Sequence, residues 1–202
     1  MNFAIRSSDL EWDDFVAMSS VMNQAFEGSL VYQPALLRNM AAAGNFVALA
    51  ESGKAVIGAL IAHVALSDKL FLFSGPLATH TEYRKLGVAK ALKSHQRFWA
   101  LERRIDEIVW PFHPRNVSSA TVAFSLSGVR CTHIEPDYYG PAPDGSRLFA
   151  SWNLQSEEAP PPVVKWVPLD GRSDSELVVE LCENLDAGLS VVTIKAGRYG
   201  LA

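Results

Sequence analysis

The sequence predicts an α/β fold in which helices cover a mixed β-sheet. Strand-like apolar runs alternate with amphipathic helical segments through residues 3–154, in the order β-α-α-β-β-β-α-β-α-β-β. Near the middle, a buried strand passes through a polar turn into a long helix and then into another strand. Strands joined by such a helical crossover are usually parallel, which predicts a mixed rather than a purely antiparallel sheet.

The N-terminal part of the chain predicts one strand followed by two helices. Residues 2–7 have the character of a short edge strand. Ser8 and Asp9 suit the N-cap of the first helix. The second helix is expected to begin at Pro34 and to end at Gly44, because proline favours the first helical turn and glycine the position after the last.

Two strand-like runs follow, over residues 46–51 and 55–66. The three residues between them, Ser52-Gly53-Lys54, are typical of a tight hairpin. The second run is apolar on both faces except at His63. This pattern predicts a central strand with the histidine in the core.

Residues 70–78 form the strand that leads into the long helix. Val88, Leu92, His95 and Trp99 recur at helical spacing and predict the buried face of that helix. Basic side chains are expected to keep much of the remaining surface in solvent: Lys85, Lys90, Lys93, Arg97, Arg103 and Arg104.

The start of this helix is where we expect a ligand. Backbone N–H groups in a first helical turn lack intrahelical partners, and the helix dipole favours an anion beside them. Gly87 would let a ligand approach the backbone, although a loop that merely tolerates glycine has the same composition. The sequence contains neither the G-x-x-x-x-G-K-[ST] loop of nucleoside-triphosphate sites nor the G-x-G-x-x-G dinucleotide pattern.

Four further elements complete the expected sheet. Residues 107–112 predict a strand and residues 118–126 a short helix of small side chains. A last pair of strands is expected at residues 129–134 and 147–154.

The composition changes after the last of these strands to a proline-rich connector, EEAPPPVVKWVP. We therefore predict a domain at residues 1–155 and, at residues 156–202, the connector and a short appendage. The appendage is expected to contain a helix over 173–185 and a strand over 189–195. Its apolar content predicts that it docks, either on the open edge of its own sheet or on that of a second copy in a homodimer.

Composition narrows the function classes. The chain has 202 residues, 49% of them hydrophobic, a formal net charge of −4 and a pI near 5.7, so binding to nucleic acid by general phosphate attraction is not expected. The sequence shows no apolar run of membrane-spanning length and no secretory signal pattern, which predicts a cytoplasmic protein without a membrane partner. Cys131 and Cys182 are too few for a disulfide framework, and Cys131 with His133 is too few for a zinc site, so no metal is expected.

The turn before the long helix carries the most specific motif in the chain. Arg84-Lys85-Leu86-Gly87-Val88-Ala89 resembles the Arg/Gln-x-x-Gly-x-Gly/Ala motif of the Gcn5-related N-acetyltransferase (GNAT) superfamily. The expected order of elements is also that of the superfamily. The resemblance implies a GNAT-like fold with an acyl-CoA cosubstrate, acetyl-CoA or another acyl-CoA, whose diphosphate is held by the turn at residues 84–90.

Within the superfamily, the sequence is similar to a poorly characterised branch of predicted acetyltransferases. That branch typically carries Trp-Thr-Phe-Asp-Pro, a later Asn-Ala, Tyr-Tyr-Gly and Asp-Arg-Leu. Here Pro111, His113, Ser119 and Ser146 replace the threonine, the first aspartate, the asparagine and the second aspartate. The departures fall on polar positions, so the scaffold implied by the resemblance stands, but no substrate or catalytic role is carried over from the branch. The segments that carry the similarity are Trp110-Pro111-Phe112-His113-Pro114, Asp137-Tyr138-Tyr139-Gly140 and Arg147-Leu148.

The resemblance implies acyl transfer from a thioester to an amine. Backbone N–H groups at residues 77–79 would bind the thioester oxygen and the pantetheine arm. Tyr139 is the candidate acid for the departing thiolate, and the alternative is an aromatic side chain of the core or of a lid. His113 is the candidate base, and the alternative is a loop histidine without a catalytic role. The residues expected to bind the cosubstrate are Leu77, Ala78, Thr79, Arg84, Lys85, Leu86, Gly87, Val88, Ala89, Lys90 and Ser119.

The predicted function is that of an acyl-CoA-dependent N-acyltransferase, in the simplest case an N-acetyltransferase, acting on the primary amine of a small molecule or a peptide. The alternative is a non-catalytic acyl-CoA-binding or assembly module on the same fold, favoured by the polar positions that are lost. A nucleotide-phosphate site on an unrelated α/β enzyme is a third interpretation, without a complete motif.

Overall fold

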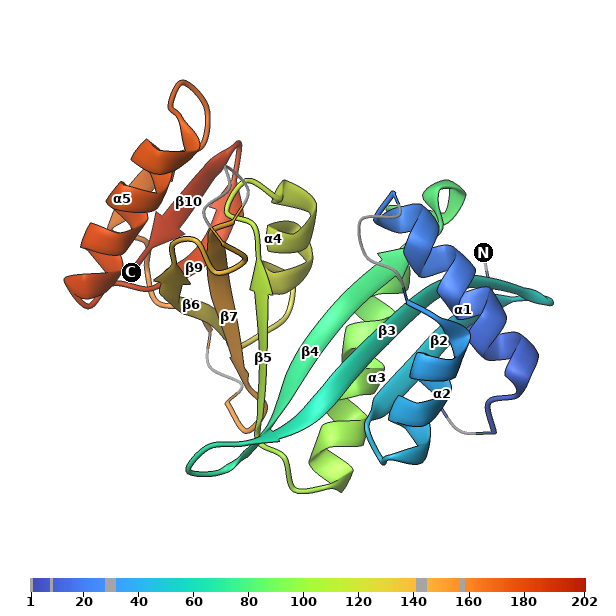
Figure 1. Cartoon of the computed structure of the whole chain (residues 1–202). Coiled ribbons are helices and arrows are strands. Elements are labelled where there is room, and N and C mark those ends of the chain that lie inside the picture. The colour runs from blue at the N-terminus through green and yellow to red at the C-terminus, as the bar shows by residue number, and fades with distance from the viewer. Residues whose placement is uncertain (1, 8, 28–31, 141–144, 157–158) are drawn as a thin grey trace. The chain divides into compact units, whose positions relative to one another are not determined.

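The computed structural model describes residues 2–7, 9–27, 32–140, 145–156 and 159–202. The chain divides into two compact units, Met1–Asp106 and Glu107–Ala202 (Figure 1). Each unit has its own strands, helices and core. The parallel pairing expected between the strands at 70–78 and 107–112 would join the two units and stays a prediction. Ser8, expected to cap the first helix, lies outside the described residues.

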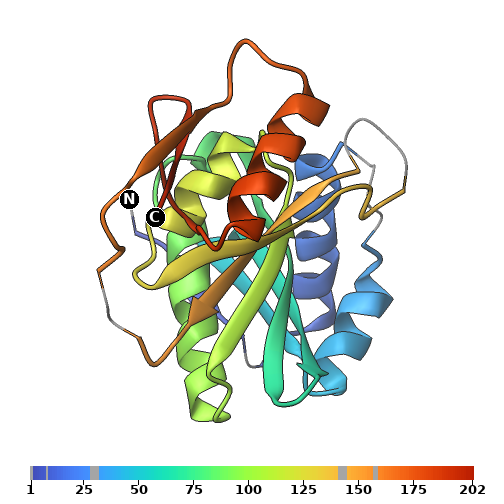
Figure 2. The same ribbon diagram turned by 90° about the vertical axis from the view of Figure 1, so that its left-hand side faces the viewer.

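The first unit is an antiparallel sheet with helices on both faces. Its strands pair in the order β1-β2-β3-β4. The helices α1 and α2 lie on one face and α3 on the other (Figures 1 and 2). The expected central place of the strand at 55–66 is confirmed, because β3 pairs with β2 and with β4. The elements are β1 (Ala4–Arg6), α1 (Trp12–Ala25), α2 (Pro34–Ala42), β2 (Phe46–Ser52), β3 (Ala55–Leu66), β4 (Leu70–Thr79), a 3-10 turn η1 (Thr81–Tyr83) and α3 (Val88–Glu102).

The two faces of this sheet bury different side chains. On one face, Met18 of α1 and Leu37 of α2 are fully buried in an apolar core against β2 and β3. On the other face, Phe46 of β2 packs against α3, with ring centroids 6.1 Å from His95 and 5.4 Å from Trp99. The expected buried face of α3 is therefore partly aromatic, and it fixes the helix to the sheet.

The far end of β3 lies outside the core. Strand β2 begins at Phe46, which pairs with Ala62, so the next residue of β3, His63, has no neighbour in β2. His63 is exposed, as are Val64 and Leu66 further along the strand. The prediction of a core histidine was wrong, because the apolar pattern continues past the point where the sheet is covered.

The first helix is capped by Glu11 rather than by the expected Asp9. Glu11 and Asp14 form a reciprocal capping box at the start of α1, whereas Asp9 has a φ of +52° and accepts a bond from Arg6 through its carbonyl. The Arg6 guanidinium also lies 2.7 Å from Asp14 and 3.2 Å from Glu51, which ties β1, α1 and β2 together. The hydrogen bond from Arg6 lowers the pKa of Asp14.

The inner face of α3 contains polar side chains as well as the expected apolar ones. Val88 and Leu92 are buried as predicted, but Lys93 is only 2% exposed and Gln96 is fully buried. Lys93 was expected in solvent, and that expectation was wrong. The position is adjacent to Leu92 and one turn before Gln96, so it belongs to the strip of the helix that faces the sheet.

The second unit is an antiparallel sheet in the order β5-β7-β6-β9-β10-β8. The helix α4 packs against β9 and α5 against β6. The strand at 107–112 has the predicted bounds, and the neighbouring elements differ from prediction by one or two residues at their ends. The elements are β5 (Glu107–Phe112), α4 (Val117–Phe124), β6 (Val129–Glu135), β7 (Arg147–Asn153), β8 (Lys165–Pro168), α5 (Asp174–Asp186), β9 (Val191–Lys195) and β10 (Arg198–Leu201).

The C-terminal appendage docks on its own unit. Strand β9 pairs with β6, where Val191 lies opposite Cys131, and Tyr199 of β10 is fully buried and donates a hydrogen bond to the carbonyl of Pro114. The segment predicted as a proline-rich connector ends in a strand, because Lys165–Pro168 pairs with β10. A strand of four residues after a proline run shows too little alternation to be recognised. The homodimer stays a prediction.

Candidate functional site

The helix α3 presents an open backbone at its first turn. Gly87 is the N-cap, with φ +85° and ψ 0°, and among the described residues no side chain caps the turn. A methyl group built on Gly87 would meet no atom of the described residues within 4 Å. An anion can therefore approach the N–H groups of this turn without a side chain in the way.

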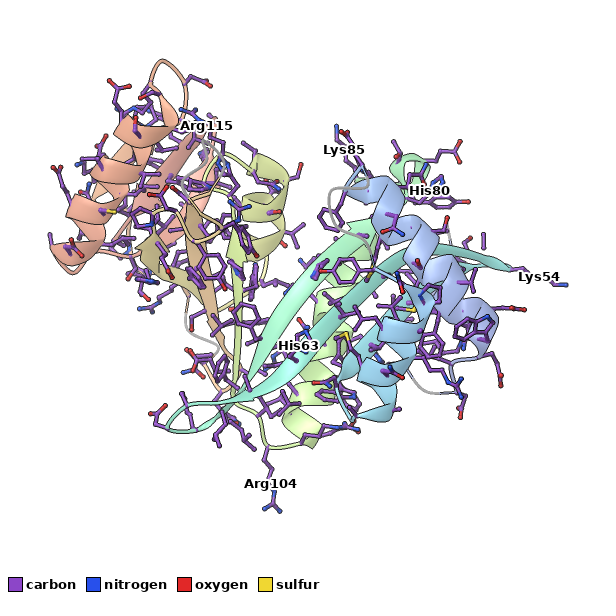
Figure 3. All side chains as sticks on the ribbon, in the orientation of Figure 1. Lys54, His63, His80, Lys85, Arg104 and Arg115 are labelled. Atoms are coloured by element: carbon purple, nitrogen blue, oxygen red, sulfur yellow. The ribbon has the colours of Figure 1, made fainter. Side chains whose placement is uncertain are left out.

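Basic side chains surround the turn. Arg84, Lys85 and Lys90 are all exposed, and Lys85 has a positive φ of +63°. The Nε of Arg84 lies 3.5 Å from the carbonyl of Thr79, at the end of β4. Figure 3 shows Lys85 at the end of the first unit where α3 begins and Arg104 at the opposite end. Because the 15 residues of α3 span about 22 Å, Arg104 cannot neutralise an anion at Gly87.

The strand that leads into this turn contains a β-bulge. Where the register between β3 and β4 shifts, two residues of β4, Gly75 and Pro76, lie opposite Ile61 alone. A methyl group on Gly75 would lie 3.2 Å from Ile61 Cγ1, and Pro76 has no N–H to donate to the ladder. A bulge bends its strand and increases the local twist. The sequence prediction missed it, although a Gly-Pro pair inside the apolar run LFLFSGPLA is the signal that indicates one.

Beyond the bulge, β4 directs two of its N–H groups away from β3. The N–H of His80 donates to the carbonyl of Ile57 at 2.9 Å, so these two residues form a hydrogen-bonded pair. Bonded and non-bonded pairs alternate along an antiparallel ladder. Leu77 and Thr79 therefore direct their N–H and C=O groups away from β3, whereas Ala78 directs its own toward it.

His80 is a candidate site residue that the sequence analysis did not single out. Its ring packs edge-on against Tyr83, with 5.7 Å between the ring centroids. Its Nδ1 atom is buried and has no hydrogen-bond partner in the described parts of the chain; the nearest carboxylate oxygen, of Glu82, is 4.0 Å away. A buried polar atom without a partner at the end of β4 is suited to bind a ligand atom.

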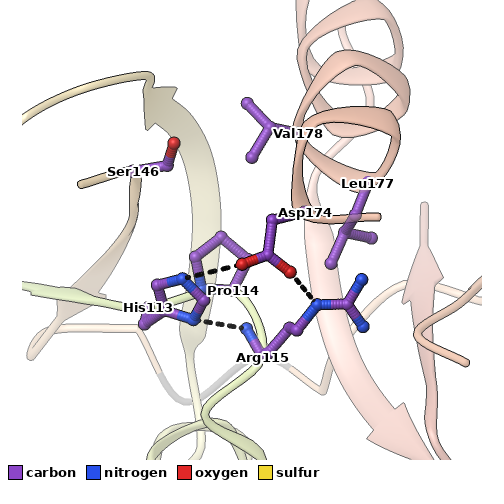
Figure 4. Close-up of a pocket in the computed structure, with 7 residues that line it drawn as sticks. All are labelled: His113, Pro114, Arg115, Ser146, Asp174, Leu177 and Val178. Atoms are coloured by element: carbon purple, nitrogen blue, oxygen red, sulfur yellow. Dashed lines mark hydrogen bonds and ion pairs between the residues drawn. The ribbon is translucent and has the colours of Figure 1, made fainter. Parts of the chain in front are cut away.

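His113 lies in the second unit, in a cluster that includes the C-terminal segment (Figure 4). Its Nδ1 accepts a hydrogen bond from the backbone N–H of Arg115 at 3.2 Å, and its Nε2 lies 3.8 Å from Asp174 Oδ2. The side chains around the ring enclose no space large enough for a water molecule. The lone pair of Nδ1 is therefore occupied, and the role of His113 as a base stays a prediction.

Arg115 holds the start of α5 in this cluster. Its guanidinium binds the carboxylate of Asp174 and donates to the backbone carbonyls of Leu169, at 2.6 Å, and Arg172. Three acceptors from residues more than fifty positions away converge on one side chain. Arg115 therefore fastens the appendage to the segment that follows β5.

Tyr139 and Ser119 occupy separate places in the second unit. Tyr139 is 63% exposed in the turn after β6, with the Arg147 guanidinium 4.5 Å above its ring and the Tyr138 ring 4.7 Å away. Ser119 lies in the first turn of α4, where its N–H donates to the N-cap side chain of Asn116 at 2.9 Å. Their predicted catalytic and binding roles stay predictions.

Comparison with solved structures identifies the fold. No family model and no curated protein matches the sequence. Solved acetyltransferase structures do match. A putative acetyltransferase from Salmonella typhimurium, with its cofactor acetyl-CoA, has a TM-score of 0.65 at 18% identity, over 80% of this chain and 99% of that one. An acetyltransferase of the GNAT family from Streptococcus pneumoniae has a TM-score of 0.64 at 11% identity, over 75% and 99%. The chain has the GNAT fold.

A third solved structure is similar over a comparable share of the chain. Arabidopsis thaliana Naa50, in complex with the bisubstrate analogue CoA-Ac-MVNAL, has a TM-score of 0.62 at 16% identity, over 75% of this chain and 98% of that one. This chain thus spans nearly the whole length of each of these structures. The fold class predicted from the sequence is confirmed.

Within the GNAT fold, the predicted site residues fall into two groups. Residues 77–79 and 84–90 come together in one strand–turn–helix of the first unit. His113, Ser119 and Tyr139 lie on three separate segments of the second unit. Across the described residues, no three His, Cys, Asp or Glu side chains gather as a metal site requires, and no helix is long and apolar enough to cross a membrane.

Proposed function

We propose that this chain is an acyl-CoA-dependent N-acyltransferase, in the simplest case an N-acetyltransferase acting on a primary amine. The observation that carries the proposal is the uncapped first turn of α3 at Gly87, which follows the bulged strand β4 in the chain. The turn is suited to an anionic diphosphate and the strand to an extended arm. One ligand that carries both is a CoA thioester.

The residues around Gly87 fit the diphosphate. The N–H groups of the first turn of α3 and the side chains of Arg84, Lys85 and Lys90 together provide hydrogen bonds and positive charge. The Salmonella typhimurium structure was solved with acetyl-CoA, which supports the choice of ligand. Leu86, Val88 and Ala89 would contribute backbone rather than side-chain contacts.

The chemistry follows from the groups that the chain offers. Acyl-CoA would supply an acyl group activated as a thioester. The N–H groups of Leu77 and Thr79, directed away from β3, can stabilise the negative charge that develops on the carbonyl oxygen as the C–N bond forms, before the C–S bond breaks and the carbonyl is restored. Tyr139 would give a proton to the departing thiolate, and His113 or a water molecule would take the proton from the amine.

The acceptor is proposed only as a class, a primary amine of a small molecule or of a peptide. The Arabidopsis Naa50 structure contains a bisubstrate analogue with a peptide portion, which supports the peptide alternative by likeness of fold alone. We further propose a cytoplasmic protein that forms a homodimer. Size-exclusion chromatography with light scattering tests the homodimer, and a monomer mass would contradict it.

A non-catalytic acyl-CoA-binding module is the second candidate. The observation that favours it is the engagement of His113 by the Arg115 N–H and the neighbouring Asp174 carboxylate, which leaves the ring without a vacant lone pair. Both candidates expect acetyl-CoA to bind at Gly87. They differ in whether an amine is acylated.

One experiment separates the two candidates. The purified chain is titrated with acetyl-CoA by calorimetry and then incubated with acetyl-CoA and a library of amines and peptides, with release of free CoA thiol as the readout. Binding with amine-dependent thiol release supports the enzyme. Binding without release across the library supports the module, and absence of binding would contradict both.

A further inference from the structure

Three polar side chains form a hydrogen-bonded cluster inside the apolar interface between α3 and β4. The Nζ of Lys93 lies 2.9 Å from Ser74 Oγ and 3.2 Å from Gln96 Oε1, and the Nε2 of Gln96 lies 3.0 Å from Ser74 Oγ. All three side chains are at most 2% exposed. Ser74 belongs to β4, and the other two belong to α3.

Burying a lysine at this position has a free-energy cost. Burial lowers the pKa of Lys93 to about 7, and its hydrogen-bond partners Ser74 and Gln96 are uncharged. An apolar side chain would fill the same space at less cost. Hydrogen bonds, unlike apolar contacts, fix the register of a helix along a strand.

The cluster lies between the two halves of the proposed acyl-CoA site. Ser74 immediately precedes Gly75 of the bulge, after which Leu77 and Thr79 direct their N–H groups away from β3. Lys93 lies six residues after Gly87, less than two turns along the helix whose first turn offers the anion site. A shift of α3 along β4 would change the distance between the anion site and the strand N–H groups.

We propose that Lys93 is a positioning residue for acyl-CoA: through Ser74 and Gln96 it locks α3 against β4 and so fixes the separation between the diphosphate site and the strand that holds the acyl arm. This inference rests on the proposed function. It requires that Lys93 matter more for a ligand that spans both halves of the site than for a ligand that occupies only one.

The test compares two ligands on the full chain. Acetyl-CoA spans both halves, whereas 3′-phospho-ADP, the nucleotide half of coenzyme A, reaches only the helix N-terminus. For Lys93→Met, which keeps the length of the side chain and removes its donors, the Kd of acetyl-CoA should rise about tenfold while that of 3′-phospho-ADP stays within about twofold. The control is Ser94→Ala on the same helix, which should change neither Kd. Ser94 is exposed, and its hydroxyl donates to the carbonyl of Lys90 at 3.0 Å.

A second variant keeps the test decisive if Lys93→Met folds poorly. Ser74→Ala removes the strand partner of the cluster with a smaller change in volume, and it should give the same split between the two ligands. Equal weakening of both ligands, or of neither, in the folded variants would overturn the positioning role. If the wild-type chain binds 3′-phospho-ADP but not acetyl-CoA, the proposed function fails and the positioning role fails with it. This outcome is seen in the wild type, whereas failure of the positioning role alone is seen only when the variants are compared with a wild type that binds acetyl-CoA.

Discussion

Gly58 of β3 and Val88 of α3 approach so closely that no side chain fits between them: a methyl group on Gly58 would lie 2.8 Å from Val88 Cγ1. The same methyl group would lie 3.1 Å from the carbonyl oxygen of Ala78 and 3.2 Å from Leu92 Cδ1. Val88 is the first residue of α3, so the absence of a side chain at position 58 lets the first turn of α3, the proposed anion site, lie close to the sheet.

Gly58→Ala should therefore displace the start of α3. Overpacking at such a contact costs roughly 1–3 kcal/mol of folding free energy, and a displaced turn should bind acetyl-CoA more weakly. Urea denaturation and calorimetry measure the two effects. Because Val88→Ala removes the closest atom, the double variant should recover most of both losses, in a double-mutant cycle. If the single and double variants lose the same amount, the contact with Val88 is not the cause.

Gly87 should be required for ligand binding beyond its effect on stability. Its φ of +85° costs a residue with a side chain on the order of 1–2 kcal/mol, and Gly87→Asp adds a negative charge beside the diphosphate, so acetyl-CoA binding should be lost. Gly44 is a matched control, because its φ is +78°, a Cβ built on it would meet no described atom within 4 Å, and it follows α2 rather than precedes α3. Gly44→Asp should destabilise the fold similarly and leave binding intact. Unchanged affinity in Gly87→Asp would remove the site from this turn.

The stability of the first unit should depend on pH through Lys93. Burial lowers the pKa of this amine from 10.5 to about 7 in the folded chain, whereas the unfolded chain keeps the ordinary value. Between these two values the unfolded state binds more protons, so stability should rise with pH, by on the order of 1 kcal/mol per unit. The slope should vanish in Lys93→Met, measured by urea denaturation from pH 7 to pH 10. Parallel curves for the two proteins would show that the amine is not desolvated in the folded state.

The sequence predicts the two strands at 55–66 and 107–112 to the residue, because long apolar runs bounded by turn residues leave little choice of ends. It does not predict that Lys93 is buried. A lysine is usually exposed, and the prediction followed the residue type although the position lies on the face of the helix that meets the sheet. The N–H directions at Leu77 and Thr79 depend on the ladder register, which single-residue patterns do not contain. The proposed anion site could be predicted from local sequence alone. The cluster of Ser74, Lys93 and Gln96 could not, because it depends on which residue of β4 lies against which turn of α3.

Arg115 should determine whether the C-terminal appendage stays attached. Its guanidinium binds Asp174 and two backbone carbonyls, so Arg115→Leu leaves these acceptors without their donor and should cost on the order of 2–4 kcal/mol. Limited proteolysis should then cut within the connector, at residues 159–164, faster than in the wild type. Arg38→Leu, an exposed arginine on α2, provides the same chemical change without these bonds and should have little effect. Equal cleavage rates in Arg115→Leu and the wild type would show that β9 and β10 hold the appendage alone.

Tyr139 should contribute to turnover and not to cosubstrate binding. Its ring is 63% exposed, whereas the ring of Tyr138, 4.7 Å away, packs against Phe149 with 5.2 Å between centroids, and partial burial raises the pKa of the Tyr138 phenol.

If Tyr139 gives a proton to the departing thiolate, Tyr139→Phe should lower kcat roughly tenfold to a thousandfold and leave the Kd of acetyl-CoA near that of the wild type. Tyr138→Phe removes the same hydroxyl from the adjacent ring and should leave kcat within about twofold. A loss of kcat in Tyr138→Phe but not in Tyr139→Phe would show that Tyr138, and not Tyr139, is the proton donor. Equal rates in both variants and the wild type would show that neither tyrosine protonates the thiolate, which would then take its proton from a water molecule.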